Sequence, residues 1–309
     1  MNTLNMKNGV IWKDVDGNDI QAHGGCIIEH QGIYYWYGEH KGADNCPGEK
    51  RVDVIGISCY SSRDLVRWKY EGLVFESDKD NPASLLHPSN VMERPKVIYN
   101  EKNDHFVLWM HIDRADYTYA GVGIAISKTP VGPFVLKTVK IPNRQDARDM
   151  TIFKDTDGTA YLVHSSNWNK TLNIARLTDD YTDVDGYYRP VLIDQEREAP
   201  ALFYKDGMYY MITSGCTGWN ANPALFARCP HLLGQWKLID NPCEGRGCRT
   251  TFSGQSSYIL EVEGRFYLML DHWHPTNLKA SGYSILPIEI TEDKNLIVPW
   301  QEEWSGIQA

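Results

Sequence analysis

The sequence predicts an all-β fold, a five-bladed β-propeller with four antiparallel strands in each blade, built as one domain over residues 1–309. The first observation is a hairpin signal that occurs five times, each with two short apolar runs around a tight polar turn. The second is a polar residue that leads each hairpin, twelve or thirteen positions before an aromatic residue that follows the turn. A strand-rich unit that recurs every 49 to 70 residues is typical of propeller blades.

We call the five polar residues the leaders; they are His23, Glu93, Asp149, Glu198 and Gln255. Propeller blades surround a central channel. If each leader opens the first strand of a blade, the five strands line this channel in the same direction. The leaders should then meet in one ring at one end of the channel, although the first and last are more than two hundred residues apart.

Short apolar runs, bounded by Gly, Pro and Asp, give the strands in chain order. Residues 9–15 resemble a lone strand, which we expect to close the ring by completing the last blade. The strand runs of the five blades are 34–40 and 55–60; 93–99, 106–110 and 121–127; 149–153, 160–164 and 171–177; 197–204, 208–212 and 224–228; and 257–260, 266–271 and 283–290. Little of the chain has the periodicity of an amphipathic helix, so we expect strand and loop nearly throughout.

Composition restricts the class of function. The net charge of -9 disfavours nucleic acid as a partner, because phosphate binding needs patches of Lys and Arg. No run of about 18 apolar residues is present, so no membrane span is expected. The N-terminus lacks the apolar region of a signal peptide, which predicts a cytoplasmic protein, or a secreted one whose signal peptide has been removed. The oligomeric state stays open.

The seven cysteines are scattered, and their spacing does not fit a zinc site. We expect reduced cysteines that pack in the core, with Cys243 and Cys248 as the only pair close enough to suspect of a disulfide. No cofactor and no metal ion are expected. His272 is placed near the channel axis, and we interpret it as a core histidine rather than a metal ligand.

Three motifs together resemble those of glycoside hydrolase family 43. They are Ser-Arg-Asp-Leu-Val-Arg-Trp at 62–68, Arg-Asp at 148–149, and Glu-Ala-Pro at 198–200 ahead of a Gly-x-Tyr-Tyr hairpin. The resemblance spans essentially the whole chain. It implies a five-bladed propeller that hydrolyses glycosidic bonds with inversion.

Within this family, the chain is most similar to the branch that contains exo-β-1,3-galactanases. The signs are Glu-Arg-Pro at 93–95, Thr-Gly-Trp at 217–219 and Ser-Gly-Gln at 253–255. Most family members place a general-base Asp at the start of blade one, where this chain reads Gln-Ala-His-Gly-Gly at 21–25. The galactanase-like branch also lacks this Asp, and the resemblance implies that Gln255 takes its place.

Inverting hydrolysis needs one carboxyl group to protonate the leaving oxygen and a second group, about 6.5 to 9.5 Å away, to direct water. We predict Glu198 as the general acid, because burial and the nearby charge of Asp149 raise a carboxyl pKa. The family analogy gives Asp149 the role of modulating this acid and orienting the sugar. Gln255 is predicted to position the water, although an amide has almost no basicity. Glu93 is the competing base, and the resemblance assigns it instead to the hydroxyls of a terminal galactose.

Five further residues are predicted to bind the sugar by hydrogen bonds or stacking. They are Glu39, Tyr119, Asn167, Thr217 and Trp219. A purely structural role is an alternative for these residues. Glu39 could lie at a solvated strand end, and Tyr119, Asn167 and Thr217 could take part in ordinary loop packing. Trp219 favours a functional role, because an exposed Trp in a Gly-Asn loop is costly without a ligand.

The sequence thus predicts an inverting, exo-acting glycoside hydrolase that binds an oligosaccharide or polysaccharide and releases terminal galactose from β-1,3-galactan of the arabinogalactan type. An α-L-arabinofuranosidase or a β-D-galactofuranosidase of the same family is an alternative, because adjacent branches share most of these residues. A non-catalytic carbohydrate-binding propeller is another, because blade one lacks the Asp. A WD-type interaction propeller is disfavoured, since no blade ends in Trp-Asp. A retaining mechanism is disfavoured as well, since blade one offers no nucleophilic carboxylate.

Overall fold

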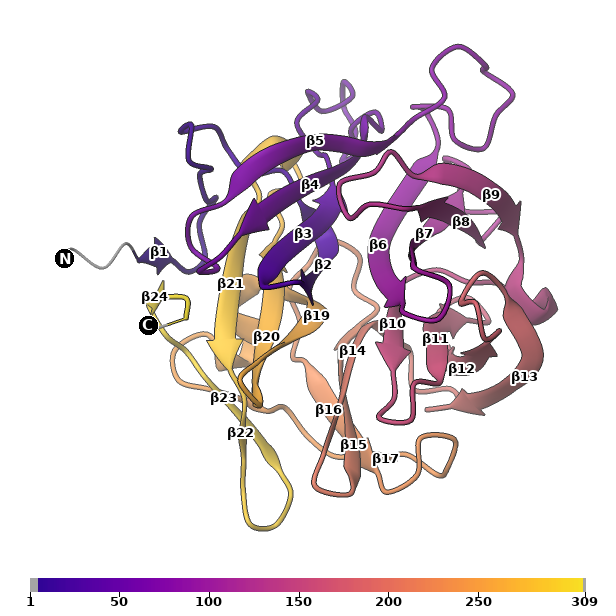
Figure 1. Ribbon diagram of the computed structural model, residues 1–309. Coiled ribbons are helices and arrows are strands. Elements are labelled where there is room, and N and C mark those ends of the chain that lie inside the picture. Colours follow the sequence, from indigo (N-terminus) through magenta and orange to yellow (C-terminus); the bar gives the residue numbers. More distant parts are fainter. Residues whose placement is uncertain (1–4, 308–309) are drawn as a thin grey trace.

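The computed structural model describes residues 5–307, which form sheets arranged around a common centre (Figure 1). The innermost strands pack against one another in a closed ring, in the order β2, β6, β10, β14 and β19. From each of these strands the chain proceeds outwards, so that neighbouring strands in a sheet are consecutive in sequence. The all-β propeller is therefore confirmed.

Four sheets have four antiparallel strands each. The first two consist of β2 (His23–His30), β3 (Ile33–Glu39), β4 (Gly56–Ser62) and β5 (Lys69–Glu76), and of β6 (Val91–Asn100), β7 (His105–Asp113), β8 (Gly121–Ser127) and β9 (Val135–Lys140). The next two consist of β10 (Met150–Lys154), β11 (Ala160–Ser166), β12 (Thr171–Leu177) and β13 (Val184–Val191), and of β14 (Arg197–Lys205), β15 (Met208–Gly215), β16 (Leu225–Cys229) and β17 (Lys237–Leu238). Each of these sheets is one of the predicted repeat units.

The predicted count of five blades with four strands each is wrong, because the described chain has six sheets of three or four strands, which we count as six blades. Five of them contribute a strand to the closed ring, and the sixth does not. One three-stranded sheet contains β19 (Gln255–Val262), β20 (Arg265–His272) and β21 (Gly282–Pro287). The other contains β18 (Cys243–Glu244), β23 (Leu296–Pro299) and β22 (Glu289–Ile290). Its strands are two to four residues long, β18 pairs with β23 in parallel, and the β22–β23 hairpin is too short to match the repeat in the other sheets.

The N-terminal segment also differs from the prediction. Residues 9–15 form no strand, and Val10 makes only an isolated bridge to Tyr283 of β21. A turn limits the segment: the Asp14 carboxylate accepts the backbone N–H groups of Asp16 and Asn18, so the chain reverses directly after the short contact with β21. The two ends of the described chain are instead joined by β1 (Met6–Lys7) and β24 (Glu303–Trp304), which pair with each other (Figure 1).

Three of the predicted hairpins have the turn that the sequence indicates. Both turn residues have positive φ in the pairs Gln31-Gly32, Asp206-Gly207 and Glu263-Gly264. This backbone matches the right-handed twist of the flanking strands. The turns lie at the opposite ends of the innermost strands from the leaders, so the leaders are free to face a common space.

A β-bulge begins directly after the leader in three of the sheets, and each of these bulges contains a residue with left-handed backbone. These residues are Gly24 (φ 58°), Arg94 (φ 54°) and Ala199 (φ 50°). A bulge bends its strand and changes the direction of the adjacent side chains. The bulges thus allow a leader and the residue after it to face the same end of the channel.

The apolar core lies in layers between neighbouring sheets. Phe203 of β14, for example, packs against Phe266 of β20 with ring centroids 4.5 Å apart, and Trp36 and Trp68 are fully buried. All seven cysteines are free, including Cys243 and Cys248. The described chain also has three short 3-10 helices, η1 (Pro142–Arg144), η2 (Cys248–Ser253) and η3 (Leu278–Ala280). None of the described helices has the length and apolar character needed to cross a membrane.

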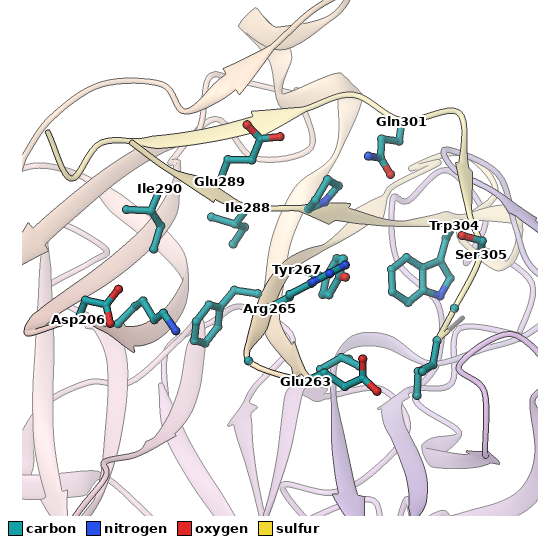
Figure 2. Close-up of a pocket in the computed structure, with 17 residues that line it drawn as sticks. Asp206, Glu263, Arg265, Tyr267, Ile288, Glu289, Ile290, Gln301, Trp304 and Ser305 are labelled. Atoms are coloured by element: carbon teal, nitrogen blue, oxygen red, sulfur yellow. The ribbon is translucent and has the colours of Figure 1, made fainter. Parts of the chain in front are cut away.

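A hollow of 810 Å³ lies at the turn between β19 and β20, far along these strands from Gln255 (Figure 2). Its walls include the turn Glu263-Gly264, strand β22 and residues 304–307. None of the five leaders lines it. The predicted site therefore lies elsewhere, at the other end of the innermost strands.

Candidate active site

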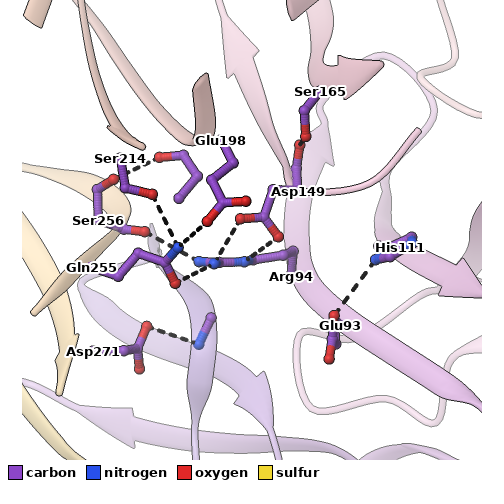
Figure 3. Close-up of polar contacts among 12 residues, drawn as sticks. Glu93, Arg94, His111, Asp149, Ser165, Glu198, Ser214, Gln255, Ser256 and Asp271 are labelled. Carbon is purple, nitrogen blue, oxygen red and sulfur yellow. Dashed lines mark hydrogen bonds and ion pairs between the residues drawn. The ribbon is translucent and has the colours of Figure 1, made fainter. Parts of the chain in front are cut away.

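Four of the five leaders line one cavity of 270 Å³: Glu93, Asp149, Glu198 and Gln255 (Figure 3). They come from four different sheets, and each stands at or beside the start of an innermost strand. The complete lining is Glu39, Lys41, Glu93, Arg94, His111, Tyr117, Arg148, Asp149, Asn169, Glu198, Gly218, Trp219, Gln255 and Trp273. The repeat pattern thus located a real convergence of polar side chains.

The fifth leader, His23, lies outside this lining and is fully buried. Its Nδ1 atom is 3.2 Å from Asp271 Oδ1, and its Nε2 atom is 3.0 Å from the Tyr283 hydroxyl. The imidazole also stacks on the Tyr283 ring, with centroids 4.7 Å apart. Because both ring nitrogens have partners, His23 offers neither an acid nor a base to the cavity.

Glycine is required at position 24, next to this leader. Gly24 has φ 58°, and a Cβ atom there would lie 2.3 Å from Glu39 Oε1. Its N–H group donates to Asp271 Oδ2 at 3.0 Å. Gly24 therefore lets the backbone pass close to the carboxylate of Glu39, and Gly25 lets it pass close to the Tyr37 carbonyl.

Arg94 connects the polar groups of the cavity, and it was not among the predicted site residues. Its Nε and Nη2 atoms donate to the two oxygens of Asp149 at 2.9 and 2.8 Å. Nη2 also donates to Gln255 Oε1 at 2.7 Å, and Nη1 donates to the Ser256 carbonyl at 3.1 Å. A buried guanidinium that makes a two-point contact fixes the geometry of its partners. Arg94 thus sets the positions of Asp149 and Gln255 relative to each other.

Glu198 has the properties of a carboxyl group that carries a proton at neutral pH. Its Oε1 atom is 3.1 Å from Gln255 Nε2, and its Oε2 atom is 3.4 Å from Asn169 Nδ2. Burial raises the pKa of Glu198 to about 8, and the negative charge of Asp149 adds to this effect against the opposing charge of Arg94. A neutral carboxyl group in a cavity can donate a proton to a bound substrate.

The amide of Gln255 is fully hydrogen-bonded in this arrangement. Its Oε1 atom accepts from Arg94 and from Trp273 Nε1, the latter at 2.9 Å. Its Nε2 atom donates to Glu198 Oε1 and to Ser214 Oγ, the latter at 3.0 Å. An amide has two donor hydrogens and two acceptor lone pairs, and these four contacts use them all.

Glu93 lies on the other side of Arg94 from Glu198 and Gln255 (Figure 3). The Tyr117 hydroxyl is 3.2 Å from its Oε1 atom, Lys41 Nζ is 3.8 Å from the same oxygen, and His111 Nδ1 is 3.7 Å from Oε2. Burial alone would raise the pKa of Glu93, but His111 and Lys41 outweigh it and lower the pKa to about 2. Glu93 is therefore an ionised carboxylate with little tendency to accept a proton.

Two buried lysines, Lys41 and Lys96, bind polar groups around the cavity. Lys41 Nζ pairs with Glu39 Oε2 at 2.7 Å, and Glu39 Oε1 accepts the backbone N–H of Arg94 at 2.9 Å. Lys96 Nζ donates to the Gly24 carbonyl at 2.6 Å and lies 3.4 Å from the Arg94 carbonyl. Burial lowers the pKa of Lys96 to about 8. Its ammonium group thus joins two of the bulges that shape the site.

Two of the five residues predicted to bind sugar line the cavity, namely Glu39 and Trp219. Glu39 is buried rather than solvated. Trp219 is half-buried, and its ring meets the Trp273 ring edge to face, with centroids 5.7 Å apart and planes at 79°. The two indoles form an aromatic wall next to Gln255.

The other three, Tyr119, Asn167 and Thr217, lie outside the lining. The backbone N–H of Tyr119 donates to Asp113 Oδ1 at 2.8 Å, and that of Asn167 donates to Asp146 Oδ1 at 2.7 Å. The Thr217 hydroxyl bonds within its own loop. Their contacts hold loops in place, and the lining positions two residues away are taken by Tyr117 and Asn169. Direct sugar binding by these three residues stays a prediction.

Sequence reasoning assigned no role to seven lining side chains. They are Lys41, Arg94, His111, Tyr117, Arg148, Asn169 and Trp273. For His111 the missing information was the strand register, which places it directly opposite Glu93. For Arg94 a signal existed, because it follows a leader in Glu-Arg-Pro, but its inward direction depends on the bulge.

Among residues 5–307, no group of three or more His, Cys, Asp or Glu side chains is arranged to hold a metal ion. His272, considered as a ligand from sequence, is buried, and its Nε2 atom is 2.7 Å from Ser284 Oγ. Burial lowers the pKa of His272 to about 4. This is the environment of a neutral core histidine.

The channel of this propeller ends in a cavity that contains a carboxyl group with a raised pKa, a second carboxyl group with a lowered pKa, and two indole rings. These groups are suited to the hydrolysis of a glycosidic bond. The comparison with known families agrees. The model of the family Glycosyl hydrolases family 43 matches residues 26–242, and the chain belongs to this family.

Solved structures of family members are similar over nearly the whole chain. A family 43 β-1,3-galactosidase, solved with galactodeoxynojirimycin, is 37% identical with a TM-score of 0.92, over 97% of this chain and 99% of that one. An exo-β-1,3-galactanase from Phanerochaete chrysosporium, solved with β-1,3-galactotriose, is 31% identical with a TM-score of 0.89, over 98% of this chain and 68% of that one. Among curated proteins, the extracellular exo-α-(1→5)-L-arabinofuranosidase ArbA from Cellvibrio japonicus is 26% identical over 68% of this chain and 67% of its own.

The raised pKa of Glu198 leads to a prediction for the pH dependence of hydrolysis. A general acid acts only in its protonated form, so kcat/KM should be retained below the pKa and lost as pH rises through about 8. Above that point we expect a fall of about tenfold per pH unit. Initial rates at low substrate concentration between pH 5 and pH 10 measure this limb. A fall centred near the ordinary value of 4.5 would contradict the assignment.

Proposed function

We propose that the protein is an inverting, exo-acting glycoside hydrolase that releases terminal galactose from β-1,3-linked galactan chains. The observation that carries this proposal is the carboxyl group of Glu198 at the wall of a small cavity, 3.1 Å from Gln255 and with its pKa raised by burial. The cavity of 270 Å³ is at the lower limit of typical ligand pockets, about 300 to 1,000 Å³. It suits one sugar unit at a chain end rather than the middle of a chain.

In the proposed reaction, Glu198 transfers its proton to the glycosidic oxygen as the bond to the anomeric carbon breaks. A water molecule attacks the anomeric carbon from the opposite face, which inverts its configuration. The proton that this water loses passes to solvent, and Glu198 regains a proton from solvent before the next turnover. Asp149, held by Arg94 at both carboxylate oxygens, adds to the rise in the pKa of Glu198. Glu93, Lys41 and the Tyr117 hydroxyl supply charged and polar groups for the hydroxyls of the terminal sugar.

Gln255 is our candidate for positioning the water, with Glu93 as the alternative. The 3.1 Å contact between Gln255 Nε2 and Glu198 Oε1 is much shorter than the separation of about 6.5 to 9.5 Å that inversion requires. The sugar ring therefore has to enter between these two groups, which breaks this contact and frees one N–H of the Gln255 amide to bind water, while Ser214, Arg94 and Trp273 still hold the rest of the amide. Glu93 is a weak base, because its pKa is about 2.

Azide rescue can distinguish Gln255 from Glu93 as the group that directs water. Gln255→Ala should lower kcat by roughly two to four orders of magnitude, and azide should restore turnover by attacking the anomeric carbon in place of water. The product from a β-galactoside would then be α-galactosyl azide, detected by NMR. Glu93→Ala should mainly raise KM and respond little to azide. Rescue of Glu93→Ala alone would assign the water to Glu93 instead.

The sugar itself is inferred from the relatives. The two galactose-active relatives are 31% to 37% identical over nearly the whole chain. An α-L-arabinofuranosidase is the second candidate, because the arabinan-active relative is 26% identical. A panel of β-1,3-galactan, α-1,5-arabinan and aryl arabinofuranosides, with released sugars separated by chromatography, tests the choice. Galactose from galactan supports the proposal, and arabinose as the only product would overturn it.

A further inference from the structure

The loop Asn167–Asn169 combines an exposed indole with an unfavourable backbone. Trp168 has 66% of its surface exposed. All three residues have positive φ, at 52°, 54° and 61°, although none is glycine. Asn adopts left-handed backbone readily. At Trp168 it is costly and persists because the surroundings enforce it, as is often found at ligand sites. The exposed indole and the unfavourable backbone together indicate a functional role for this loop.

Asp146 enforces this conformation. Its carboxylate accepts the Ser166 hydroxyl at 2.7 Å and the backbone N–H groups of Asn167 and Trp168 at 2.7 and 3.1 Å. The same carboxylate pairs with Arg148, a residue of the cavity lining. The loop and Arg148 are thus anchored to one group.

The Trp168 ring is held next to the cavity. The guanidinium carbon of Arg148 lies 4.4 Å from the centroid of the indole, within the range of a cation–π contact. Asn169, the residue after Trp168 in sequence, also lines the cavity, and its Nδ2 atom lies 3.4 Å from Glu198 Oε2. Both neighbours of the indole are therefore cavity residues.

The position of the general acid tells which part of a substrate would meet this loop. Glu198 must stand beside the glycosidic oxygen, which joins the terminal sugar to the rest of the chain. The polar groups around Glu93 lie on the far side of Arg94 (Figure 3). The terminal sugar occupies the cavity between these groups, so the next sugar leaves on the side of Glu198, Asn169 and Trp168.

We propose that Trp168 is a specificity-determining residue, an aromatic platform for the sugar on the leaving-group side of the bond that is cleaved. The inference rests on the proposed function. A pyranose ring has an apolar C–H face that packs on an aromatic side chain. Because Trp168 contacts the leaving-group sugar and not the terminal sugar, it favours the hydrolysis of galactan chains over that of galactosides with a small leaving group.

The test compares Trp168→Ala, Trp168→Phe and wild type on β-1,3-galactotriose, with galactose as a competitive inhibitor. Galactose alone occupies the cavity, so its inhibition constant reports the terminal-sugar site. Trp168→Ala should lower kcat/KM for the trisaccharide by about tenfold, the effect of one aromatic contact, and leave the galactose constant unchanged. Trp168→Phe should recover part of the loss.

Tyr187→Ala is the matched control. Tyr187 is 50% exposed, belongs to the outer strand β13, and also lies under an Arg side chain, with Arg176 5.4 Å from its ring centroid. It should behave as wild type. An unchanged kcat/KM in Trp168→Ala overturns the platform, as does an equal loss of galactose affinity. If wild type cleaves arabinan and not galactan, the proposed substrate fails, and the platform is judged by the same comparison on arabinotriose.

Discussion

Replacing Glu198 with Gln should lower kcat/KM by roughly two to four orders of magnitude, the usual contribution of a general acid. Gln is nearly the same size and keeps hydrogen-bonding groups near Gln255 and Asn169, but it has no proton to give to the leaving oxygen. The loss should be smaller for an aryl glycoside with an acidic leaving group, which needs little protonation. Initial rates on galactotriose and on such an aryl galactoside measure both effects.

Two controls make the result specific. Glu196→Gln removes a carboxylate two residues away that is exposed to solvent, and it should leave the rate unchanged. Galactose binding to Glu198→Gln, measured by calorimetry, should persist. If wild type binds galactan oligosaccharides without hydrolysing them, the protein is a carbohydrate-binding propeller. If Glu198→Gln hydrolyses them at the wild-type rate, the acid is a different residue.

The same substitution should change stability in a pH-dependent way. The folded-state pKa of Glu198, about 8, lies above its ordinary value of 4.5. Between these values the folded protein binds a proton that the unfolded chain has lost, so this group contributes stability below pH 4.5 that disappears as pH rises to about 8. Gln does not titrate, so the melting temperature of Glu198→Gln relative to wild type should rise across this window. A constant difference would contradict the raised pKa.

Replacing Arg94 with Met is expected to be the most damaging change outside the general acid. It leaves the carboxylate of Asp149 without the guanidinium that binds both its oxygens, which costs about 3 to 5 kcal/mol when one partner of a buried pair is removed. It also removes the donor to Gln255 Oε1. Displacement of positioned groups by about 1 Å can cost about a hundredfold in rate. Chemical denaturation and kcat/KM measure the two losses.

Arg94→Lys separates charge from geometry. Lys restores a positive charge near Asp149 but cannot make two parallel N–H contacts, so stability should recover more than activity. Arg176→Met is the surface control, because Arg176 pairs with Asp185 at an exposed position and such pairs contribute about 1 kcal/mol or less. Wild-type stability in Arg94→Met would show that Arg94 does not organise the site.

The positions of four leaders could be predicted because hairpin chemistry is local. A turn such as Asp206-Gly207 can be recognised from its residue types. The start of the preceding strand, where the leader lies, is then found by counting back a fixed number of residues. The blade count could not be read in the same way. Strand β18 pairs with β23 across more than fifty residues of sequence, and β22 and β23 form a hairpin whose strands are only two and four residues long, so neither pairing has a clear local signal.

The side chains around the leaders were harder to predict, because their directions depend on backbone detail. Arg94 enters the cavity through a bulge with φ 54°. Asn167 and Asn169 are alike in sequence, and only the left-handed run between them decides that Asn169 faces Glu198. Lys41 follows Glu39 by two residues, and its burial depends on the opposite charges that surround it. Local propensity carries little information on such contacts.

A proton NMR time course with β-1,3-galactan oligosaccharides tests the central claim most directly. The anomeric signal of the first released sugar reports the sugar, the linkage that was cleaved and the stereochemistry in one measurement. We expect α-galactose to appear first, from inversion of a β-linkage, with β-galactose following only by mutarotation. Initial release of β-galactose would contradict the inverting mechanism, and galactan that stays intact under conditions that release arabinose from arabinan would contradict the assigned substrate.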